Sequence, residues 1–590
     1  NNNNAGLAGV YTTPQSIAAN LNQVSYIDAR IFAMDYWAPT VITRTMAGAR
    51  FTHVLSPETF YEVSSSVFRT AYDTNPGRGR DNTRRYVFGN ADSVDEAPFG
   101  FQPAPSTGID GLRMSVGFSN SRDTSRVTVW TNRFDISSQV DRYDQVKAGA
   151  EFVYVDNNVN YGSVDIFLPS GRSRSSWHTF PKRAAAYIQD KIEFEGMVAN
   201  IGVRFDYSYA GGYWYEYNPY DKAFTGDLSL GLDTLLVHVP TKKRVTVSPR
   251  LGVSFPVTED SKLYFNYGHF RSMPTPENLF LIRRYSDNNQ VTRLADPNAP
   301  LPKTVQYELG YDQNLFDQFL LHLAGYYKDV TDEPTLTEYI SKDKKVDYSK
   351  TTPTFYEDIR GFEISLTKNR GDWITGFINY TYEVSSSGRF GWSVYYQNPF
   401  QQFQYETDPY NIENDLYQSK PVPAPYARAN VSLFTPPDYG PALGGLKPLA
   451  DWRLNLLGNW QAGSYFTWAG GGGTAIAGLK NNVQWRDYYN LDLRLSKALK
   501  IAGVNVEFFM DMTNVLNTKH FTTYGFKDGN DYSAYMRSLH LPAGIGDRLS
   551  YGNIPGDDRP GDYRNFGVEF VPIVYKTNAD ALSQDRNPVS

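Results

Sequence analysis

The stretch AAAYIQDKIEFEGMVANIGVRFDY, residues 184–207, alternates polar and apolar side chains on both sides of Glu195-Gly196. A period of two along the chain predicts β-strands, and the Glu-Gly pair predicts a tight turn between them. One face of the two strands is apolar and carries Ala186, Ile188, Ile192, Phe194, Met197, Ala199, Ile201, Val203, Phe205 and Tyr207. The opposite face carries charged, amide and glycine residues. The stretch therefore predicts a hairpin with one apolar and one polar face.

The same pattern recurs at 245–255, 262–267, 305–312, 362–367, 491–496 and 504–512. Strands of about ten residues with one wholly apolar face are typical of a transmembrane barrel. Lipid offers no hydrogen-bond partners to the backbone, so a sheet in a bilayer has to close on itself. We therefore expect an all-β protein, a transmembrane antiparallel β-barrel.

The connections between these strands alternate in length. Short turns are expected at Ser56–Thr59, Glu195-Gly196, Thr258–Ser261, Asn314–Asp317, Asn369–Gly371 and Ala498–Gly503, and 436–450 is placed on the same side. Long connections are expected at 70–125, 155–184, 208–244, 271–303, 329–359, 385–425, 463–488 and 514–563. In outer-membrane barrels, short turns face the periplasm and long loops face outward. This rule predicts about eighteen strands, from near Tyr26 to near Phe570.

The boundaries follow from this count. We expect residues 26–571 to form the barrel with its outward loops, residues 1–25 to be an N-terminal segment of unclear role, and residues 572–590 to be a periplasmic tail.

Composition excludes several classes of function. The 57 basic and 63 acidic residues among 590 give a net charge of −6, which removes the electrostatic basis for binding nucleic acid. The absence of cysteine excludes disulfides, thiolate catalysis and cysteine-ligated zinc. The sequence contains no apolar run of about 18 residues, so no transmembrane helix is expected. The seven histidines lack metal-ligand spacing, and no G-x-S-x-G motif occurs. We expect no catalytic residues, metal or cofactor, and hence no enzyme.

Two long connections are rich in aromatic residues. One interpretation is a belt at the membrane interface together with packing of the loops. The other is a platform that binds a ligand, because aromatic faces bury large areas at low entropic cost. The candidate ligand-binding residues are Tyr213, Trp214, Tyr215, Tyr217, Trp392, Tyr395, Tyr396, Phe400 and Phe403.

Several segments resemble, in order and spacing, the barrel region of TonB-dependent outer-membrane receptors. They include 184–207, SPRLGVSFPVTEDSKLYFNYGHF (248–270), LPKTVQYELGYDQNLFDQFLLHLAGYYKDVTD (301–332), IRGFEISLTKNRGDWITGFINYTY (359–382) and NLDLRLSKALKIAGVNVEFFMDMTNVLNTKH (490–520). THVLSPETFYEV (52–63) and SSQVDRYDQVKAGAEF (137–152) are similar to Oar-like receptors, which carry a carboxypeptidase-regulatory-like domain. The resemblance covers roughly residues 45–570.

The resemblance implies a barrel of 22 strands, a plug and a TonB box. No plug or TonB box is recognisable in this sequence, so we expect the plug and the first four strands to lie upstream or to have been removed. The resemblance also implies a multi-pass protein of the Gram-negative outer membrane that contacts lipid, couples to TonB–ExbB–ExbD through the plug, and imports a scarce ligand. A surface lipoprotein is a possible partner.

The ligand stays open among siderophore, cobalamin, glycan and peptide. Two alternative functions also stay open. One is a passive porin-like channel, which the eight long loops disfavour. The other is a barrel-anchored protein of surface adhesion or assembly.

Overall fold

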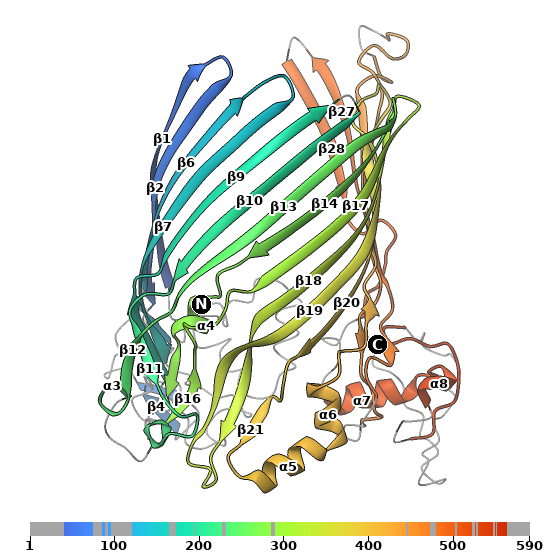
Figure 1. The fold of residues 1–590 in the computed structure, drawn as a ribbon. Helices are drawn as coiled ribbons and strands as arrows, with labels where there is room; N and C mark the ends of the chain where they lie inside the picture. The colour runs from blue at the N-terminus through green and yellow to red at the C-terminus, as the bar shows by residue number, and fades with distance from the viewer. Residues whose placement is uncertain are drawn as a thin grey trace.

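The computed structural model describes residues 40–74, 85–88, 92–95, 121–163, 173–194, 196–226, 232–284, 290–443, 447–471, 479–501, 504–521, 526, 529–546, 549 and 551–562. Long strands form one antiparallel ladder in which each strand pairs with the next along the chain (Figure 1). The first half consists of β1 (Thr40–Ser56), β2 (Thr59–Thr74), β6 (Arg126–Gln139), β7 (Asp144–Ser163), β9 (Lys182–Phe194), β10 (Met197–Tyr209), β13 (Lys243–Thr258) and β14 (Ser261–Arg271). The second half consists of β17 (Lys303–Leu315), β18 (Phe319–Ile340), β19 (Asp347–Lys368), β20 (Ile374–Arg389), β23 (Tyr426–Phe434), β24 (Trp452–Gln461), β27 (Tyr488–Ile501) and β28 (Val504–Met512).

The sheet of 22 strands includes six short ones, β5 (Ser121–Asp123), β8 (Ser173–Thr179), β15 (Ile282–Arg284), β16 (Val291–Leu294), β21 (Val394–Tyr396) and β22 (Val422–Pro423). Sixteen long strands remain, and they correspond to sixteen of the eighteen expected from the sequence. The other two, near Tyr26 and near Phe570, lie outside the described residues. The predicted segments 1–25 and 572–590 lie outside them as well.

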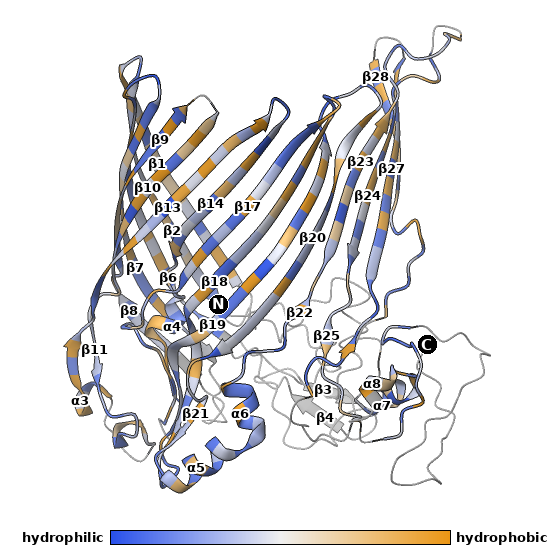
Figure 2. Ribbon diagram, turned by 45° about the vertical axis from the view of Figure 1, so that its right-hand side comes forward, coloured by the Kyte–Doolittle hydropathy of each residue, from blue (hydrophilic) through white to orange (hydrophobic). Residues whose placement is uncertain are grey.

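The alternation of faces is the one that the sequence predicts. Ile188, Ile201, Phe205 and Leu309 are 48–55% exposed on the outer face of the sheet. Hydrophobic and hydrophilic colours alternate along these strands (Figure 2). A water-soluble protein rarely exposes so much contiguous apolar surface, whereas a bilayer requires it.

The inner face is polar and contains ion pairs. Asp312 accepts a hydrogen bond from the His322 ring (2.6 Å) and lies 3.1 Å from the Lys262 ammonium group. Close to this group, Tyr264 stands directly opposite Gly310, and a Cβ added at Gly310 would lie 2.1 Å from the Tyr264 ring. Glycine at this position therefore allows the tyrosine ring to lie flat against the wall of the barrel.

The strands are longer than the sequence suggests. β18 and β19 have 22 residues each, and their outer halves occupy most of the expected loop 329–359. These halves pair with each other as far as Ile340 and Asp347. The alternation of polar and apolar residues fades there, and the exposure of successive residues no longer alternates. The period of two therefore predicted only the part of the hairpin in which exposure alternates.

Two turns are also shifted from their expected places. β17 continues to Leu315, so that turn spans 316–318, and β27 continues to Ile501. All the short turns lie at one end of the ladder, here called the turn side (Figure 1).

The opposite end, the loop side, holds the small elements. The strands among them are β3 (Arg85–Phe88), β4 (Asp92–Asp95), β11 (Tyr213–Glu216), β12 (Val237–Pro240), β25 (Tyr465–Phe466) and β26 (Val483–Gln484). The helices are η5 (Lys222–Phe224), α3 (Leu232–Leu235), α4 (Pro276–Phe280), α5 (Pro399–Thr407), α6 (Pro409–Asp415), α7 (Gly529–Ser538) and α8 (Ala543–Gly546). None of the helices in the described part of the chain is long and apolar enough to span a bilayer.

Candidate functional site

The long connections fold into compact structure with its own hydrophobic core. Fifteen buried residues from β7, β8 and the stretch 210–348 form one cluster, here called the loop core. Phe224, Leu232, Leu294 and Tyr348 in it are at most 1% exposed. A second cluster surrounds α7 and includes Tyr535, Met536 and Tyr551. Surface loops of this length are usually functional or disordered, and a buried core of this size indicates a pre-formed surface.

A column of aromatic rings joins the two predicted aromatic clusters. The ring of Tyr217 contacts that of Phe224, with the centroids 5.2 Å apart, and Phe224 contacts Tyr348 at 4.8 Å. Tyr348 in turn contacts Tyr339 at 5.8 Å, and Tyr339 stacks on Tyr395 at 5.6 Å. Burial raises the pKa of Tyr217 and of Tyr348 well above the usual tyrosine value. The structure therefore joins Tyr217 and Tyr395 through the intervening rings. The column as a whole links three connections.

Three other predicted residues line a cavity of about 820 Å³ beside the loop core. Tyr213, Trp214 and Tyr215 enter it from β11. Tyr213 is 68% exposed, whereas Trp214 is only 8% exposed and also packs into the loop core. The remaining wall comes from Ser176, Trp177, His178, Thr179, Phe180, Gly211, Gly212, Asp233, His238, Thr241, Phe280, Ile282 and Pro297. Its volume lies within the roughly 300–1,000 Å³ of pockets that hold small molecules.

Hydrogen bonds fix the polar wall of this cavity. The Tyr215 hydroxyl donates to Asp233 Oδ1, and His238 Nε2 lies 3.4 Å from the same oxygen. Burial, followed by the hydrogen bond and the charge of Asp233, raises the pKa of Tyr215 far above its usual value. Tyr215 consequently stays protonated at neutral pH and acts as a donor. On β8, His178 Nε2 is hydrogen-bonded to Asp156 Oδ1 (2.8 Å). The ring of His178 also lies against that of Phe180, with the centroids 4.7 Å apart.

The second predicted cluster divides into packed and exposed residues. Trp392 and Tyr396 pack against Tyr405, with ring centroids 5.8 and 6.0 Å apart. Burial, and after it the hydrogen bond to Asp415, raises the pKa of Tyr405 to about 12. By contrast, Phe400 and Phe403 are 66% and 63% exposed on α5. They are three positions apart, so they share one face of that helix.

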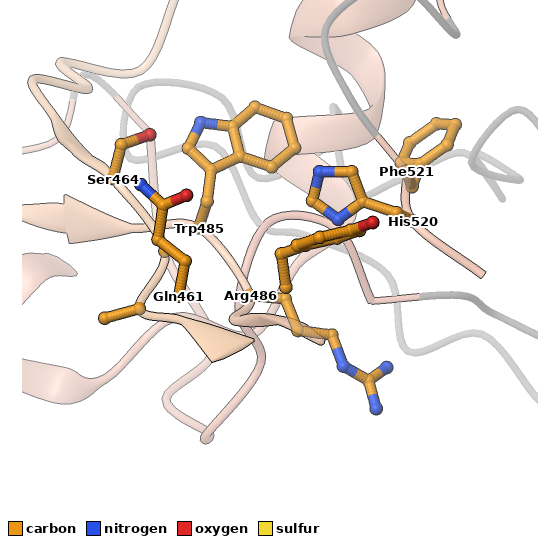
Figure 3. Close-up of a pocket in the computed structure, with 9 residues that line it drawn as sticks. Gln461, Ser464, Trp485, Arg486, His520 and Phe521 are labelled. Atoms are coloured by element: carbon orange, nitrogen blue, oxygen red, sulfur yellow. The ribbon is translucent and has the colours of Figure 1, made fainter. Parts of the chain in front are cut away.

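A smaller cavity of about 290 Å³ lies near the ends of β24 and β27 (Figure 3). Trp485, Tyr488 and His520 line it together with Gln461, Ala462, Gly463, Ser464, Arg486 and Phe521. The Arg486 guanidinium points away from the Trp485 indole in Figure 3 and lies 3.3 Å from Asp562. Burial lowers the pKa of His520. This cavity contains none of the predicted residues.

In the described ranges, no group of three or more histidine, aspartate or glutamate side chains is placed to hold a metal ion.

The sequence profile of one family, described as "TonB dependent receptor-like, beta-barrel", matches residues 1–515 of the 590. The chain belongs to this family. The matched residues include all strands from β1 to β28. The family is one of receptors, in agreement with the prediction that the chain is not an enzyme.

Solved structures similar to this receptor include the ferric-catecholate import receptor Fiu from E. coli K12, with 14% identity and a TM-score of 0.46. The ferric yersiniabactin uptake receptor FyuA from Yersinia pestis has 12% identity and a TM-score of 0.45. The outer membrane transporter YddB from Escherichia coli has 12% identity and a TM-score of 0.49. Each covers 82% of this chain, and the chain spans 58–61% of each of them. No curated protein sequence matches the receptor.

Sequence reasoning missed several residues of the larger cavity in this receptor. Trp177 and His178 come from one segment, and Asp233 and His238 come from another more than 50 positions later in the chain. The segment SRSSWHT (173–179) forms β8, but Trp177 is its one large apolar residue, so no alternation of polar and apolar residues indicates a strand there. Nothing local to either segment indicated that β8 would lie beside the β11–β12 hairpin.

Proposed function

We propose that this receptor sits in the outer membrane of a Gram-negative bacterium, captures a small extracellular ligand in the 820 Å³ cavity and imports it. The energy comes from the inner membrane through TonB, because a passive barrel cannot concentrate a solute. The cavity is the observation that carries the proposal. It lies on the loop side, which faces outward in barrels of this class.

Two further features support capture rather than passive diffusion. The loop core and the aromatic column hold the cavity in a fixed shape, and pre-organisation lowers the entropic cost of binding. Passive diffusion through a porin does not require loops that are held in a fixed shape by a buried hydrophobic core.

The test is ligand uptake in cells that express the receptor, with and without TonB. Accumulation that depends on TonB and falls when Tyr213 is replaced by alanine is expected. Uptake that is unchanged without TonB, and proportional to the external concentration, would instead identify a porin.

Phe400 and Phe403 favour a second candidate function. Two exposed phenylalanines on one helical face are suited to contact with another protein, such as a surface lipoprotein or an adhesion partner. If replacement of both by serine abolished surface assembly while uptake stayed at the wild-type level, the adhesive function would be supported.

A further inference from the structure

Two arginines of the β15–β16 hairpin lie directly opposite each other. Arg283 of β15 is in register with Arg293 of β16 in an antiparallel pairing. Side chains of directly opposite residues share one face of the pair, and their Cβ atoms are about 5 Å apart. The hairpin lies on the loop side next to α4, where the Asp296 backbone nitrogen donates to the Asn278 carbonyl (Figure 1). Two like charges in this arrangement destabilise the hairpin.

The two guanidinium groups differ in how they are held. Arg293 is partly buried, and its Nη2 donates to Asn278 Oδ1 of α4 (3.2 Å). Burial, followed by the charge of Arg283, lowers the pKa of Arg293, so its charged form is destabilised at this place. Arg283 is exposed, so a solute can reach the pair from the side of this residue.

One carboxylate lies near the pair. Glu277 of α4 is close enough for its charge to act on Arg293, and both arginines act on the hydroxyl of Tyr161 at the outer end of β7. Within the described residues, neither arginine forms an ion pair with a carboxylate. Two guanidinium groups therefore share the influence of one carboxylate, and positive charge remains.

We propose that Arg283 and Arg293 together bind one oxyanion group, a phosphate or a carboxylate, of a soluble extracellular molecule. Guanidinium groups present N–H donors in a planar fork that matches the oxygens of both groups. An anion between the two arginines also removes their repulsion. Arg293 Nε is buried and takes no part, so the anion binds the terminal N–H groups.

This site is separate from the larger cavity. Ile282, the neighbour of Arg283, lines that cavity, but neither arginine does. The inference therefore adds a second binding site to the one in the proposed function.

The test uses the full chain purified in detergent. Calorimetry measures the binding of inorganic phosphate and of citrate, and sodium chloride keeps the ionic strength constant so that screening does not change. We expect at least one of the two anions to bind with saturation. If neither binds in excess of chloride, the proposal is overturned.

Variants separate the arginine pair from the general charge of the surface. Arg283→Gln removes an exposed charge and should weaken binding of the anion at least about tenfold, since it removes a charge-assisted hydrogen bond. Arg284→Gln is the matched control, because it removes the same charge from the next residue of β15, whose charge acts on Tyr215 instead. An equal loss in both variants would show a diffuse field and contradict the assignment.

Hydrogen exchange of residues 282–284 and 291–294 gives a second readout. Without an oxyanion, Arg283→Gln should be protected up to about fivefold more strongly than the wild type, because the repulsion is gone. Saturating phosphate or citrate should protect the wild type and leave the variant unchanged. Equal responses of the two proteins would contradict the bridging anion.

Lipid is the other source of phosphate at the cell surface. The exchange measurement is therefore repeated in nanodiscs with and without lipopolysaccharide. Protection by phosphate or citrate in discs without lipopolysaccharide is expected. If only lipopolysaccharide protected the hairpin, the anion would belong to a lipid and the assignment to a soluble molecule would fall.

The outcomes also separate this inference from the proposed function. Absence of anion binding to the purified receptor would overturn the arginine site and leave capture in the cavity standing. Uptake that is independent of TonB would overturn the proposed function, whereas anion binding that depends on Arg283 would still support the arginine site.

Discussion

The rings of Tyr339 and Tyr395 stack with their centroids 5.6 Å apart and their planes 16° apart. Tyr339 lies on β18 and Tyr395 on β21, and the two residues are in register in a parallel pairing. The hydroxyl of Tyr220 also donates to the Tyr395 carbonyl (3.2 Å). Three connections that are distant in the sequence therefore meet at one pair of rings.

The first prediction concerns Tyr348, at the centre of the aromatic column. Its hydroxyl is buried and has no partner among the described residues. Tyr348→Phe should therefore leave the loops as stable as in the wild type or slightly more stable. Tyr348→Ala should destabilise them by about 3–5 kcal/mol, because it leaves a cavity. Limited proteolysis on the loop side measures both, and equal sensitivity of the two variants would contradict the prediction.

The second prediction concerns the pH dependence of the β18–β19 hairpin beyond the membrane. Burial, then the hydrogen bond and the charge of Asp347, raises the pKa of Glu338 above its ordinary value of 4.5. The folded hairpin thus binds the proton more tightly than the unfolded one. Its extra stability is complete below pH 4.5 and is lost as the pH rises through the raised pKa.

Hydrogen exchange of residues 334–352 between pH 4 and pH 8 is the measurement, with rates corrected for the intrinsic effect of pH. Protection in the wild type should decrease as the pH rises, whereas Glu338→Gln should be protected at all pH values. A wild-type profile as flat as that of the variant would show that the folded hairpin does not raise the pKa of Glu338.

The third prediction tests which face of the sheet contacts lipid. Ile201 is 52% exposed on the outer face, and its neighbour Asn200 accepts a hydrogen bond from Gln189 on the inner face. Ile201→Arg should block assembly, because arginine near the bilayer midplane costs about 2–4 kcal/mol. Asn200→Arg should assemble normally. Heat-modifiability on gels reports assembly, and similar behaviour of the two variants would reverse the assignment of faces.

The fourth prediction concerns Gly310 and the tyrosine that lies over it. A Cβ at Gly310 would lie 2.1 Å from the ring of Tyr264, whereas a Cβ at Gly325 would meet only a backbone oxygen at 4.0 Å. Gly310→Ala should destabilise the barrel by about 1–3 kcal/mol, a typical cost of overpacking. Gly325→Ala is the control and should be neutral. Urea unfolding in detergent distinguishes them, and a neutral Gly310→Ala would mean that Tyr264 moves aside at no cost.

The wall of the barrel was predictable because lipid imposes a simple rule on it. Residues that face the bilayer have to be apolar at every second position, so Ile188 and Ile201 mark the strands without knowledge of their partners. The turn at Gly196 follows from the same local chemistry, since its φ of 93° suits glycine.

The loop side was predictable only as a set of candidate residues. Tyr213, Trp214 and Tyr215 line the cavity as wall residues, but Tyr217 and Tyr395 serve as packing. Which of the two roles an aromatic residue takes depends on contacts such as that between Phe224 and Tyr348, which lie more than 100 positions apart. No local period encodes such a contact.

The aromatic column has a consequence for engineering the receptor. Because Tyr217, Tyr348 and Tyr395 come from three separate connections, a chimaera that receives one connection from another receptor inherits rings without their partners. Such a graft exposes apolar surface on both sides of the missing contact. Transplanting a new specificity onto this barrel therefore requires exchanging the three connections as a set.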